Sequence, residues 1–501
     1  FFERHTVAWL DGQDDRFLEA QGRLTEPMAY DAASDRYRPI AWDDAFATIA
    51  RALNALGSPD EAIFYTSGRT SNEAAFLYQL FVREYGTNNL PDCSNMCHEA
   101  SGVALIEQLG SGKGSVTLED FEHAQAIFIF GQNPGTNHPR MLGELRSAAK
   151  RGCRIVAFNP LRERGLERFA NPQSPADMLG GSGVQLASEY YQPRIGGDLA
   201  VATALCKVVI ESGAVDRAFV AAYTHGYDDF EANVRATQWD ALERESGLSR
   251  VDLEQAARTY LASDATIVCW GMGITQHPRS VATIQMLANL LLLRGNIGKP
   301  GAGPCPVRGH SNVQGDRTMG IYEQPSPAFL DRLGATFDFT PPREHGYDTI
   351  GAIEAMFDHR AKVFFAMGGN FAAATPDTGH THEALRRCEL TVHVSTKLNR
   401  SHLVHGAQAL ILPCLGRTEI DLQAGGPQAV TVEDSMSMVH LSSGMNPPAS
   451  ELLMSEPAIV ARLAAASLPR SRTPWLWLVE DYDRIRERIA QVVEGFADFN
   501  A

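Results

Sequence analysis

Two cysteines and a histidine lie close together in the segment NNLPDCSNMCHEASG. Cys93 and Cys97 are four positions apart, and His98 follows Cys97 directly. This spacing allows a metal pair, two buried thiols, or a site in which only one thiol is functional. A zinc pair is improbable, because no second Cys or His pair at metal spacing accompanies it. Cys97 is the stronger functional candidate, since the EASG turn after His98 can open a helix, and helix N-termini favour thiolate.

A second segment rich in polar side chains reads RGNIGKPGAGPCPVRGHSNVQGD and covers residues 294–316. Its six glycines and three prolines prevent a regular helix or strand. A long ordered loop of this kind is more often a binding element than a connector. Arg308, with Gly309 beside it, can approach a small carboxylate closely and bind it through its guanidinium.

Glycine, asparagine and arginine residues also follow two strand-like runs. The segment GQNPGTNHPR follows the run AIFIF and contributes Gly131, Asn133 and Gly135. The segment FNPLRERG follows a second run and contributes Arg162 and Arg164. Exposed backbone N–H groups and arginines at such positions bind pyrophosphate and other anions. One loop of this kind is weak evidence. Six loops of this kind in one chain, each after a strand-like run, together indicate nucleotide binding.

Short apolar runs alternate with helix-like segments along most of the chain. The runs include EAIFY, AIFIF, RIVAF, TIVCW, KVFFAM and LTVHV, and segments such as DLEQAARTYLAS and VATIQMLANLLLLRG separate them. Strands without polar alternation are typical of buried parallel sheets with crossover helices. We therefore expect an α/β fold with two mixed or parallel sheet domains flanked by helices. The binding loops should lie at the carboxyl ends of the strands.

The composition excludes several classes of partner. The net charge of −16 repels phosphate backbones and anionic lipid, so we expect no nucleic-acid partner. We also expect no transmembrane segment, because the longest apolar run, at 287–293, is far shorter than the roughly 20 residues that cross a bilayer. Eight cysteines scattered over 501 residues favour a reducing compartment, and hence a cytoplasmic protein.

Several enzyme signatures are absent from the sequence. The segment GSGKGS at 110–115 lacks both the first glycine and the final Ser or Thr of a Walker loop. Neither HExxH nor a G-x-S-x-G turn occurs, and no G-x-G-x-x-G follows the first strand, as an NAD-linked dehydrogenase would require.

The motifs SNMCHEASG, GQNPGTNHPR, FNPLRERG, CWGMGITQH, GNIGKPGAGPCPVRGHSNVQGDRTMG, MGGNF and STKLNRSH occur in this order. With this set the chain resembles the molybdopterin oxidoreductases, and within them the branch of the formate dehydrogenase alpha subunit. The resemblance implies molybdenum or tungsten with two molybdopterin guanine dinucleotides, and two-electron oxidation of formate or a similar small substrate. It also implies a [4Fe-4S] cluster in the full-length protein, although no cysteine spacing for its ligands occurs in this chain.

The same resemblance implies a role for individual residues. Cys97 would ligate the metal, His98 would manage the released proton by titrating near neutrality, and Arg308 would hold the substrate carboxylate. Cys93 is expected to be a packing residue. The implied cofactor-binding residues are Gly131, Asn133, Gly135, Asn159, Arg162, Arg164, Asp198, Gly271, Met272, Gly273, Gln276, Gly309, His310, Gly368, Asn370, Lys397 and Asn399.

We expect four parts in the chain. Residues 1–40 would be the remainder of a truncated or modified iron–sulfur domain, and 41–92 with 311–430 a discontinuous α/β domain. Residues 93–310 would form the α/β domain that binds the pterin nucleotide, and 431–501 a helical segment leading toward a barrel domain. Two alternatives remain open, namely an oxyanion or N-/S-oxide reductase of the same cofactor class, and a non-catalytic pterin-fold subunit of a larger redox complex. The sequence does not identify the protein or subunit that accepts the electrons.

Overall fold

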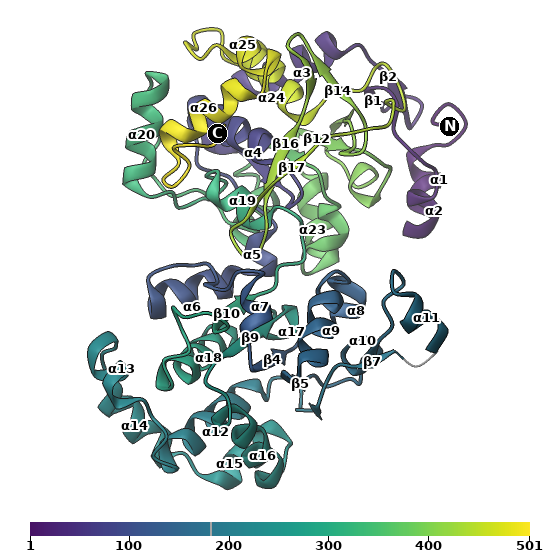
Figure 1. Cartoon of the computed structure of the whole chain (residues 1–501). Helices are drawn as coiled ribbons and strands as arrows, with labels where there is room; N and C mark the ends of the chain where they lie inside the picture. Colours follow the sequence, from purple (N-terminus) through teal and green to yellow (C-terminus); the bar gives the residue numbers. More distant parts are fainter. Residues whose placement is uncertain (181–182, 501) are drawn as a thin grey trace. The chain divides into compact units, whose positions relative to one another are not determined.

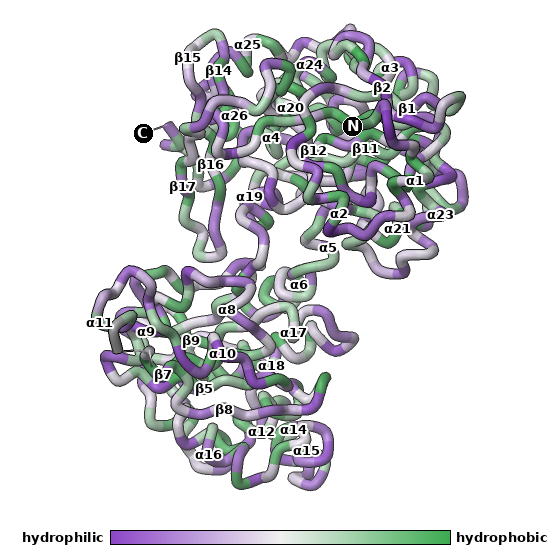
Figure 2. Tube along the Cα trace, turned by 90° about the vertical axis from the view of Figure 1, so that its right-hand side faces the viewer, coloured by the Kyte–Doolittle hydropathy of each residue, from purple (hydrophilic) through white to green (hydrophobic). Residues whose placement is uncertain are grey.

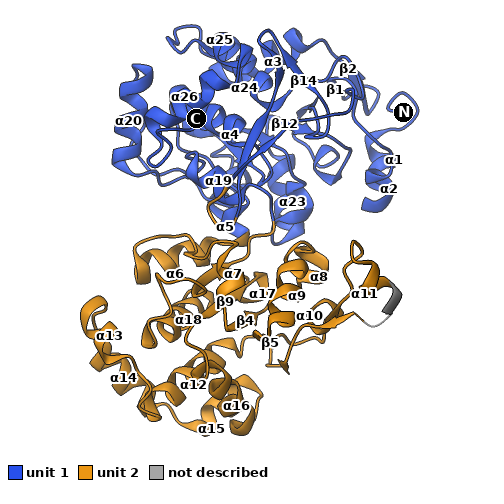
Figure 3. Ribbon diagram, viewed as in Figure 1, with its two compact units in different colours: residues 1–96, 310–434, 439–501 blue, residues 97–309, 435–438 orange. Residues whose placement is uncertain are grey.

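The computed structural model describes residues 1–180 and 183–500, which form two compact units (Figures 1 and 3). Unit 1 comprises Phe1–Met96, His310–Asp434 and Val439–Ala501, and unit 2 comprises Cys97–Gly309 and Ser435–Met438. Each unit contains its own large sheet with helices packed on it. The predicted α/β fold with two sheet domains is therefore confirmed.

The units differ from the predicted four parts in two places. Residues 1–40 lie in unit 1, because β1 (Met28–Asp31) pairs antiparallel with β13 (Gln408–Pro413) and extends its sheet. Residues 439–501 also lie in unit 1, where α24 (Glu456–Ser467) packs against α3 (Trp42–Asn54). Neither segment carries a long apolar strand, so its sequence gives no sign of the sheet that it joins. The functions assigned to the four parts stay predictions.

The sheet of unit 1 has six strands, and four of them are parallel. Their side chains are almost all buried, as the uninterrupted apolar runs predict. Strands β1 and β2 continue the sheet in antiparallel pairing beyond β13. In spatial order the strands are β2 (Arg36–Pro39), β1, β13, β12 (Leu390–Ser395), β11 (Val363–Met367) and β3 (Ala62–Thr66).

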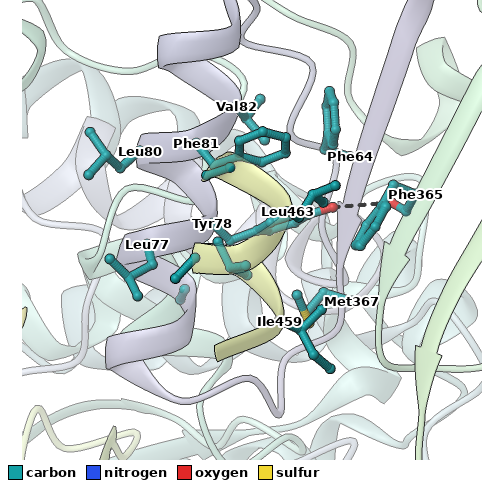
Figure 4. Close-up of a cluster of buried hydrophobic side chains, with 14 of the residues drawn as sticks. Phe64, Leu77, Tyr78, Leu80, Phe81, Val82, Phe365, Met367, Ile459 and Leu463 are labelled. Carbon is teal, nitrogen blue, oxygen red and sulfur yellow. Dashed lines mark hydrogen bonds between the residues drawn. The ribbon is translucent and has the colours of Figure 1, made fainter. Parts of the chain in front are cut away.

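Helices α4 (Asn72–Tyr85) and α24 pack on this sheet and form the core shown in Figure 4. The Ser71 side chain caps α4 by accepting a hydrogen bond from the Ala74 amide. Within the core, the Tyr78 hydroxyl donates to the Phe365 carbonyl at 3.2 Å, so its polar atom is satisfied.

The remaining elements of unit 1 surround this core. They are α1 (Val7–Asp11), α2 (Asp15–Glu19), η1 (Pro59–Glu61), α19 (Val313–Thr318), α20 (Pro327–Phe337), α21 (Thr349–Phe357), α22 (Phe371–Ala374), α23 (Thr378–Arg386), η2 (Arg400–His402), α25 (Trp475–Glu480), α26 (Asp483–Val492) and the antiparallel pairs β14 (Asp421–Gln423) with β15 (Gly426–Gln428) and β16 (Val430–Glu433) with β17 (Val439–Ser442).

The sheet of unit 2 has five strands, all parallel. The chain builds β4, β5 and β8 in one direction and then returns to the other side of β4 for β9 and β10. This reversal makes a topological switch point between β4 and β9, the place where open α/β sheets bind ligands. In spatial order the strands are β10 (Gly303–Pro306), β9 (Thr266–Trp270), β4 (Ala126–Phe130), β5 (Arg154–Phe158) and β8 (Glu189–Tyr191). The expectation that residues 294–316 form no regular helix or strand is therefore wrong, because β10 and the start of α19 lie in this segment. The prolines of β10 are tolerated because it is an edge strand.

Helices and one short strand pair complete unit 2. They are α6 (Glu99–Leu109), α7 (Asp120–His123), α8 (Pro134–Asn137), α9 (Met141–Arg151), α10 (Arg164–Glu167), β6 (Arg168–Phe169) with β7 (Val184–Gln185), α11 (Pro175–Gly180), α12 (Asp198–Glu211), α13 (Arg217–Tyr223), α14 (Tyr227–Ala236), α15 (Trp239–Ser246), α16 (Arg250–Leu261), α17 (Met272–Thr275) and α18 (Ser280–Leu293).

Hydrophobic residues, drawn in green in Figure 2, are concentrated in the interior strands and the helices that pack on them. Within residues 1–180 and 183–500, no helix is long and apolar enough to cross a bilayer.

Candidate active site

Cys97 is buried, with 5% of its surface exposed, and ends the short helix α5 (Ser94–Cys97). Its Sγ lies 3.6 Å from the Sδ of Met272, the first residue of α17 after strand β9. Two sulfur atoms from segments 175 positions apart therefore meet in unit 2. Thiolate and thioether are soft donors, of the kind that soft metal centres prefer.

His98 is completely buried and immediately precedes helix α6. Its Nδ1 lies 3.0 Å from the Ser101 hydroxyl, which also accepts a hydrogen bond from the indole N–H of Trp270 at 2.9 Å. Burial lowers the pKa of His98 to about 3, and the positive charge of Arg308 lowers it further, while the Val307 carbonyl has a smaller opposing effect. The expectation that His98 titrates near neutrality is therefore wrong for this structure, because packing removes the imidazole from water.

Arg308 is 9% exposed and lies in unit 2 with Cys97 and His98. The peptide groups on both sides of its Cα are held. Its amide donates to the Ser435 hydroxyl at 3.0 Å, and its carbonyl accepts from the His138 ring at 3.1 Å. One guanidinium nitrogen also donates to the Gly112 carbonyl at 3.3 Å. A buried guanidinium in this position can attract a small anion.

Glycines let the loops after β4 and β9 approach each other at the switch point of unit 2. A Cβ atom on Gly131 would lie 2.9 Å from the backbone of Gly273, and the Gly273 amide donates to the Gly131 carbonyl at 3.0 Å. Gly271 lies equally close to this crossing, since a Cβ there would be 3.0 Å from the Gly131 carbonyl oxygen. The three predicted glycines are thus brought together, in a backbone cradle that side chains would fill.

Gly135 meets a glycine that the sequence analysis did not select. A Cβ on Gly165 would lie 2.6 Å from the Gly135 Cα, so the loops after β4 and β5 also touch through bare backbone. The signal available in the sequence was the glycine at the end of the FNPLRERG segment.

The other predicted residues of unit 2 are less closely grouped. Arg162 and Arg164 are exposed in the loop after β5, and Arg162 pairs with Glu167 at 2.5 Å. Asp198 begins α12, and burial raises the pKa of its carboxyl to about 6.

The remaining predicted residues of unit 2 form local hydrogen bonds or are exposed. The Asn133 side chain accepts from the Thr136 amide, and that of Asn159 donates to the Leu161 carbonyl. Gln276 and Gly309 are exposed, and a Cβ on Gly309 would meet no atom within 4 Å. Gly309 is therefore not required by packing within the described chain.

Unit 1 contains the remaining predicted residues, at the carboxyl ends of β11 and β12. The Asn370 side chain accepts from the Ser401 amide at 3.3 Å, and the Asn399 side chain donates to the Gly369 carbonyl at 3.1 Å. Gly368 follows β11 with a φ of +71°, a conformation that favours glycine. Gly368, Asn370 and Asn399 are thus brought together.

Lys397 and His310 lie apart from that group in unit 1. The Lys397 side chain is exposed, although Lys397 stands only two positions before Asn399 in the chain. The Nδ1 of His310 lies 3.9 Å from the Sγ of Cys93, which is buried in an apolar cluster. Cys93 is thus a packing residue that also contacts a predicted binding residue.

Three further residues of the site were missed by the sequence analysis. Ser101 contacts His98, Trp270 donates to Ser101, and His138 holds Arg308. Ser101 stands three positions after His98 at the start of a helix, a spacing that places side chains on one face and that could have indicated their contact. The other two contacts join segments remote in sequence and have no local signal.

The fold and the glycine-lined crossing define an α/β protein with a candidate ligand site at the switch point of unit 2, and comparison with known proteins gives its class. The chain belongs to the molybdopterin oxidoreductase family, whose model matches residues 23–413.

The chain is 52% identical over its whole length to Protein YdeP of Escherichia coli, of which it covers 67%. It is 54% identical to an uncharacterized oxidoreductase of Mycobacterium tuberculosis, of which it covers 65%. It thus spans about two thirds of the length of these relatives.

More distant similarities agree with this family. The chain is 31% identical to formate dehydrogenase H of Escherichia coli over 312 residues, which are 61% of this chain and 41% of that protein. The predicted formate dehydrogenase-like branch is therefore confirmed. The acetylene hydratase of Pelobacter acetylenicus has the same fold, with a TM-score of 0.71 over 95% of this chain and 65% of its own, at 16% identity.

The residues of this site fit a molybdopterin cofactor. Side chains are absent where the three loops cross, and Cys97 offers one soft ligand. Among the described residues, no group of three or more His, Cys, Asp or Glu side chains could hold a metal ion.

Proposed function

We propose that the chain is the catalytic core of a molybdenum- or tungsten-dependent oxidoreductase that carries two molybdopterin guanine dinucleotides and oxidises formate or a similar small anion. The observation that supports this most strongly is the presence in one unit of buried Cys97, buried His98 and nearly buried Arg308. A non-catalytic subunit would have no use for a buried arginine held at both of its peptide groups.

Each of the three residues has a distinct task in this proposal. Arg308 binds the substrate carboxylate, since its guanidinium stays charged and offers paired donors. Cys97 supplies a thiolate to the metal. Formate gives carbon dioxide, one proton and two electrons as its C–H bond breaks, and the cofactor supplies the two-electron acceptor. His98 enters as a neutral imidazole that positions groups by hydrogen bonding, because its pKa of about 3 leaves it uncharged at neutral pH.

The nucleotide arms would bind at the loops of the two sheets. In unit 2 the absence of side chains at Gly131, Gly271 and Gly273 would let a pyrophosphate approach the backbone closely. The carboxylate of Asp198 would accept hydrogen bonds from the N–H groups of a guanine base, which would favour its ionised form. In unit 1 the loops that contain Gly368 and Asn370 would bind the second nucleotide.

We further propose a cytoplasmic location and a separate electron-accepting protein or subunit. All eight cysteines are buried, which suits a reducing compartment. The [4Fe-4S] cluster of the full-length protein stays a prediction.

Metal and pterin analysis of the purified chain, followed by formate-dependent dye reduction, tests the proposal. Cys97→Ala should abolish dye reduction, because the metal loses its only protein ligand. Cys153→Ala, at an equally buried thiol of unit 2, should leave the metal and pterin content and the rate unchanged. Absence of pterin and metal from the wild-type protein would refute the cofactor. Turnover of an oxyanion or N-oxide without formate oxidation would instead support the reductase.

A further inference from the structure

His138 connects the nucleotide-binding loop after β4 to the backbone of Arg308. Its Nε2 lies 3.1 Å from the Arg308 carbonyl, and its Nδ1 lies 3.2 Å from the side-chain amide nitrogen of Gln132. Both ring nitrogens are therefore engaged. Gln132 is itself 3% exposed, and its amide nitrogen also contacts the Met141 sulfur at 3.2 Å, so the residue behind the ring is buried and has a second contact.

The partners of His138 determine which ring nitrogen carries the proton. A backbone carbonyl can only accept, so Nε2 must carry the hydrogen that it donates to Arg308. The Nδ1 of the neutral ring is then an acceptor, and the amide N–H of Gln132 satisfies it. The contacts on the two sides of the ring thus require the same neutral tautomer.

The consequence of these contacts lies at Arg308. Its amide is held by the Ser435 hydroxyl and its carbonyl by His138, so both peptide planes around its Cα are fixed. With these planes fixed, the direction of the Cα–Cβ bond is also fixed, and with it the base of the guanidinium arm. Without His138, the Arg308 carbonyl loses its hydrogen bond, and the peptide plane on that side is no longer fixed.

We propose that His138 is a positioning residue that holds Arg308 in the orientation needed to bind the substrate anion. The inference rests on the proposed function of Arg308 as the substrate-binding group. His138 does not touch the substrate in this proposal, and it acts only through the Arg308 carbonyl.

Two substitutions separate this role from general packing. In His138→Gln the side-chain amide places an N–H near the position of Nε2, whereas in His138→Asn the amide reaches only the position of Nδ1. We expect His138→Asn to raise the KM for formate about three- to ten-fold, the effect of one neutral hydrogen bond, with kcat within about two-fold of wild type. His138→Gln should restore the KM. His225→Asn, at an exposed histidine of unit 2, should change neither constant.

Hydrogen exchange, followed by mass spectrometry on the full chain, provides a readout that needs no turnover. The segment 303–312 should exchange faster in His138→Asn than in wild type and return to the wild-type rate in His138→Gln. An unchanged KM in His138→Asn, or failure of His138→Gln to restore it, would overturn the role of His138. If the wild-type protein oxidises no formate, the proposed substrate fails, and hydrogen exchange alone decides. Equal exchange in all three proteins would then refute the inference about His138.

Discussion

Cys93 and Cys97 show how two similar residues take different roles within four positions of the chain. Cys93 packs in an apolar cluster against the strands of unit 1 and contacts His310. Cys97 lies against Met272 in unit 2, beside His98. The neighbouring sulfur and histidine therefore distinguish Cys97 from Cys93 as the candidate metal ligand.

Arg308 is the residue whose substitution tests substrate binding most directly. Arg308→Lys keeps the positive charge but loses the planar pair of donors, so the KM for formate should rise about ten- to one hundred-fold. Metal and pterin content should stay at the wild-type level, as measured by elemental analysis and pterin fluorescence. Arg250→Lys, at an arginine of unit 2 whose side chain is 51% exposed, is the matched control. Loss of the metal in Arg308→Lys would contradict the role of Arg308 in binding substrate.

The ionised carboxylate of Asp198 should lower the stability of the folded protein when no ligand is bound. Burial raises the pKa of its carboxyl from 3.8 to about 6, so on raising the pH the unfolded chain loses this proton before the folded chain does. The folded state should therefore lose about 1–2 kcal/mol of stability between pH 4 and 6, and the loss should persist above pH 6.

Asp198→Asn should remove this penalty. We expect a higher urea midpoint than wild type for the cofactor-free protein at pH 8, a smaller difference at pH 4, and weaker retention of the guanine nucleotide. Asp264→Asn, at a side chain that is 88% exposed, should show none of these changes. An unchanged midpoint at pH 8 in Asp198→Asn would contradict the prediction that a buried, ionised Asp198 carboxylate destabilises the fold.

At the scale of elements, the site of unit 2 depends on loops that cross without side chains. The loops after β4, β5 and β9 meet at Gly131, Gly135, Gly165 and Gly273, where backbone lies against backbone. This arrangement keeps side chains out of the crossing, so that the backbone of the three loops is bare there.

Gly165→Ala should damage this crossing more than a glycine substitution elsewhere. The new Cβ would lie 2.6 Å from the Gly135 Cα, which requires the two loops to separate and should cost about 1–3 kcal/mol. We expect Gly165→Ala to have a lower urea midpoint and a lower pterin content than the wild type. Gly143→Ala is the control, because its Cβ would meet no atom within 4 Å on helix α9, and it should raise the midpoint slightly. Equal pterin content in the two variants would show that the crossing does not form part of the cofactor site.

At the scale of the whole molecule, the two units have separate hydrophobic cores. The largest cluster of unit 1 is built around β3, β11, α4 and α24, and that of unit 2 around β4, β9, α12 and α18. No residue belongs to both clusters, so the units should unfold as two cooperative steps.

Calorimetry with one core substitution in each unit tests this expectation. Leu463→Ala should lower the midpoint of one transition, and Leu290→Ala that of the other, since each removes a completely buried side chain at a cost of about 2–5 kcal/mol. A single transition that both substitutions lower by the same amount would show that the two units unfold together.

The sequence alone determined the class of fold and the candidate binding segments. Runs such as AIFIF and KVFFAM lack polar alternation because their strands are buried on both faces, and this property is readable without any structure. Gly131 and Gly271 could be selected for a similar reason, since glycines that follow strands are recognisable locally. Cys97 and Arg308 could be selected from residue type and neighbours, and the resemblance to a family then implied their roles and that of His98.

Only the tertiary structure decided how these residues are supported. The pKa of His98 depends on burial and on the charge of Arg308, more than 200 positions away. The contact of His138 with Arg308, the crossing of Gly135 with Gly165 and the addition of β1 to the sheet of unit 1 likewise join distant segments. The order of the strands brings these segments together, and no short stretch of sequence encodes that order, because it results from packing of the whole chain.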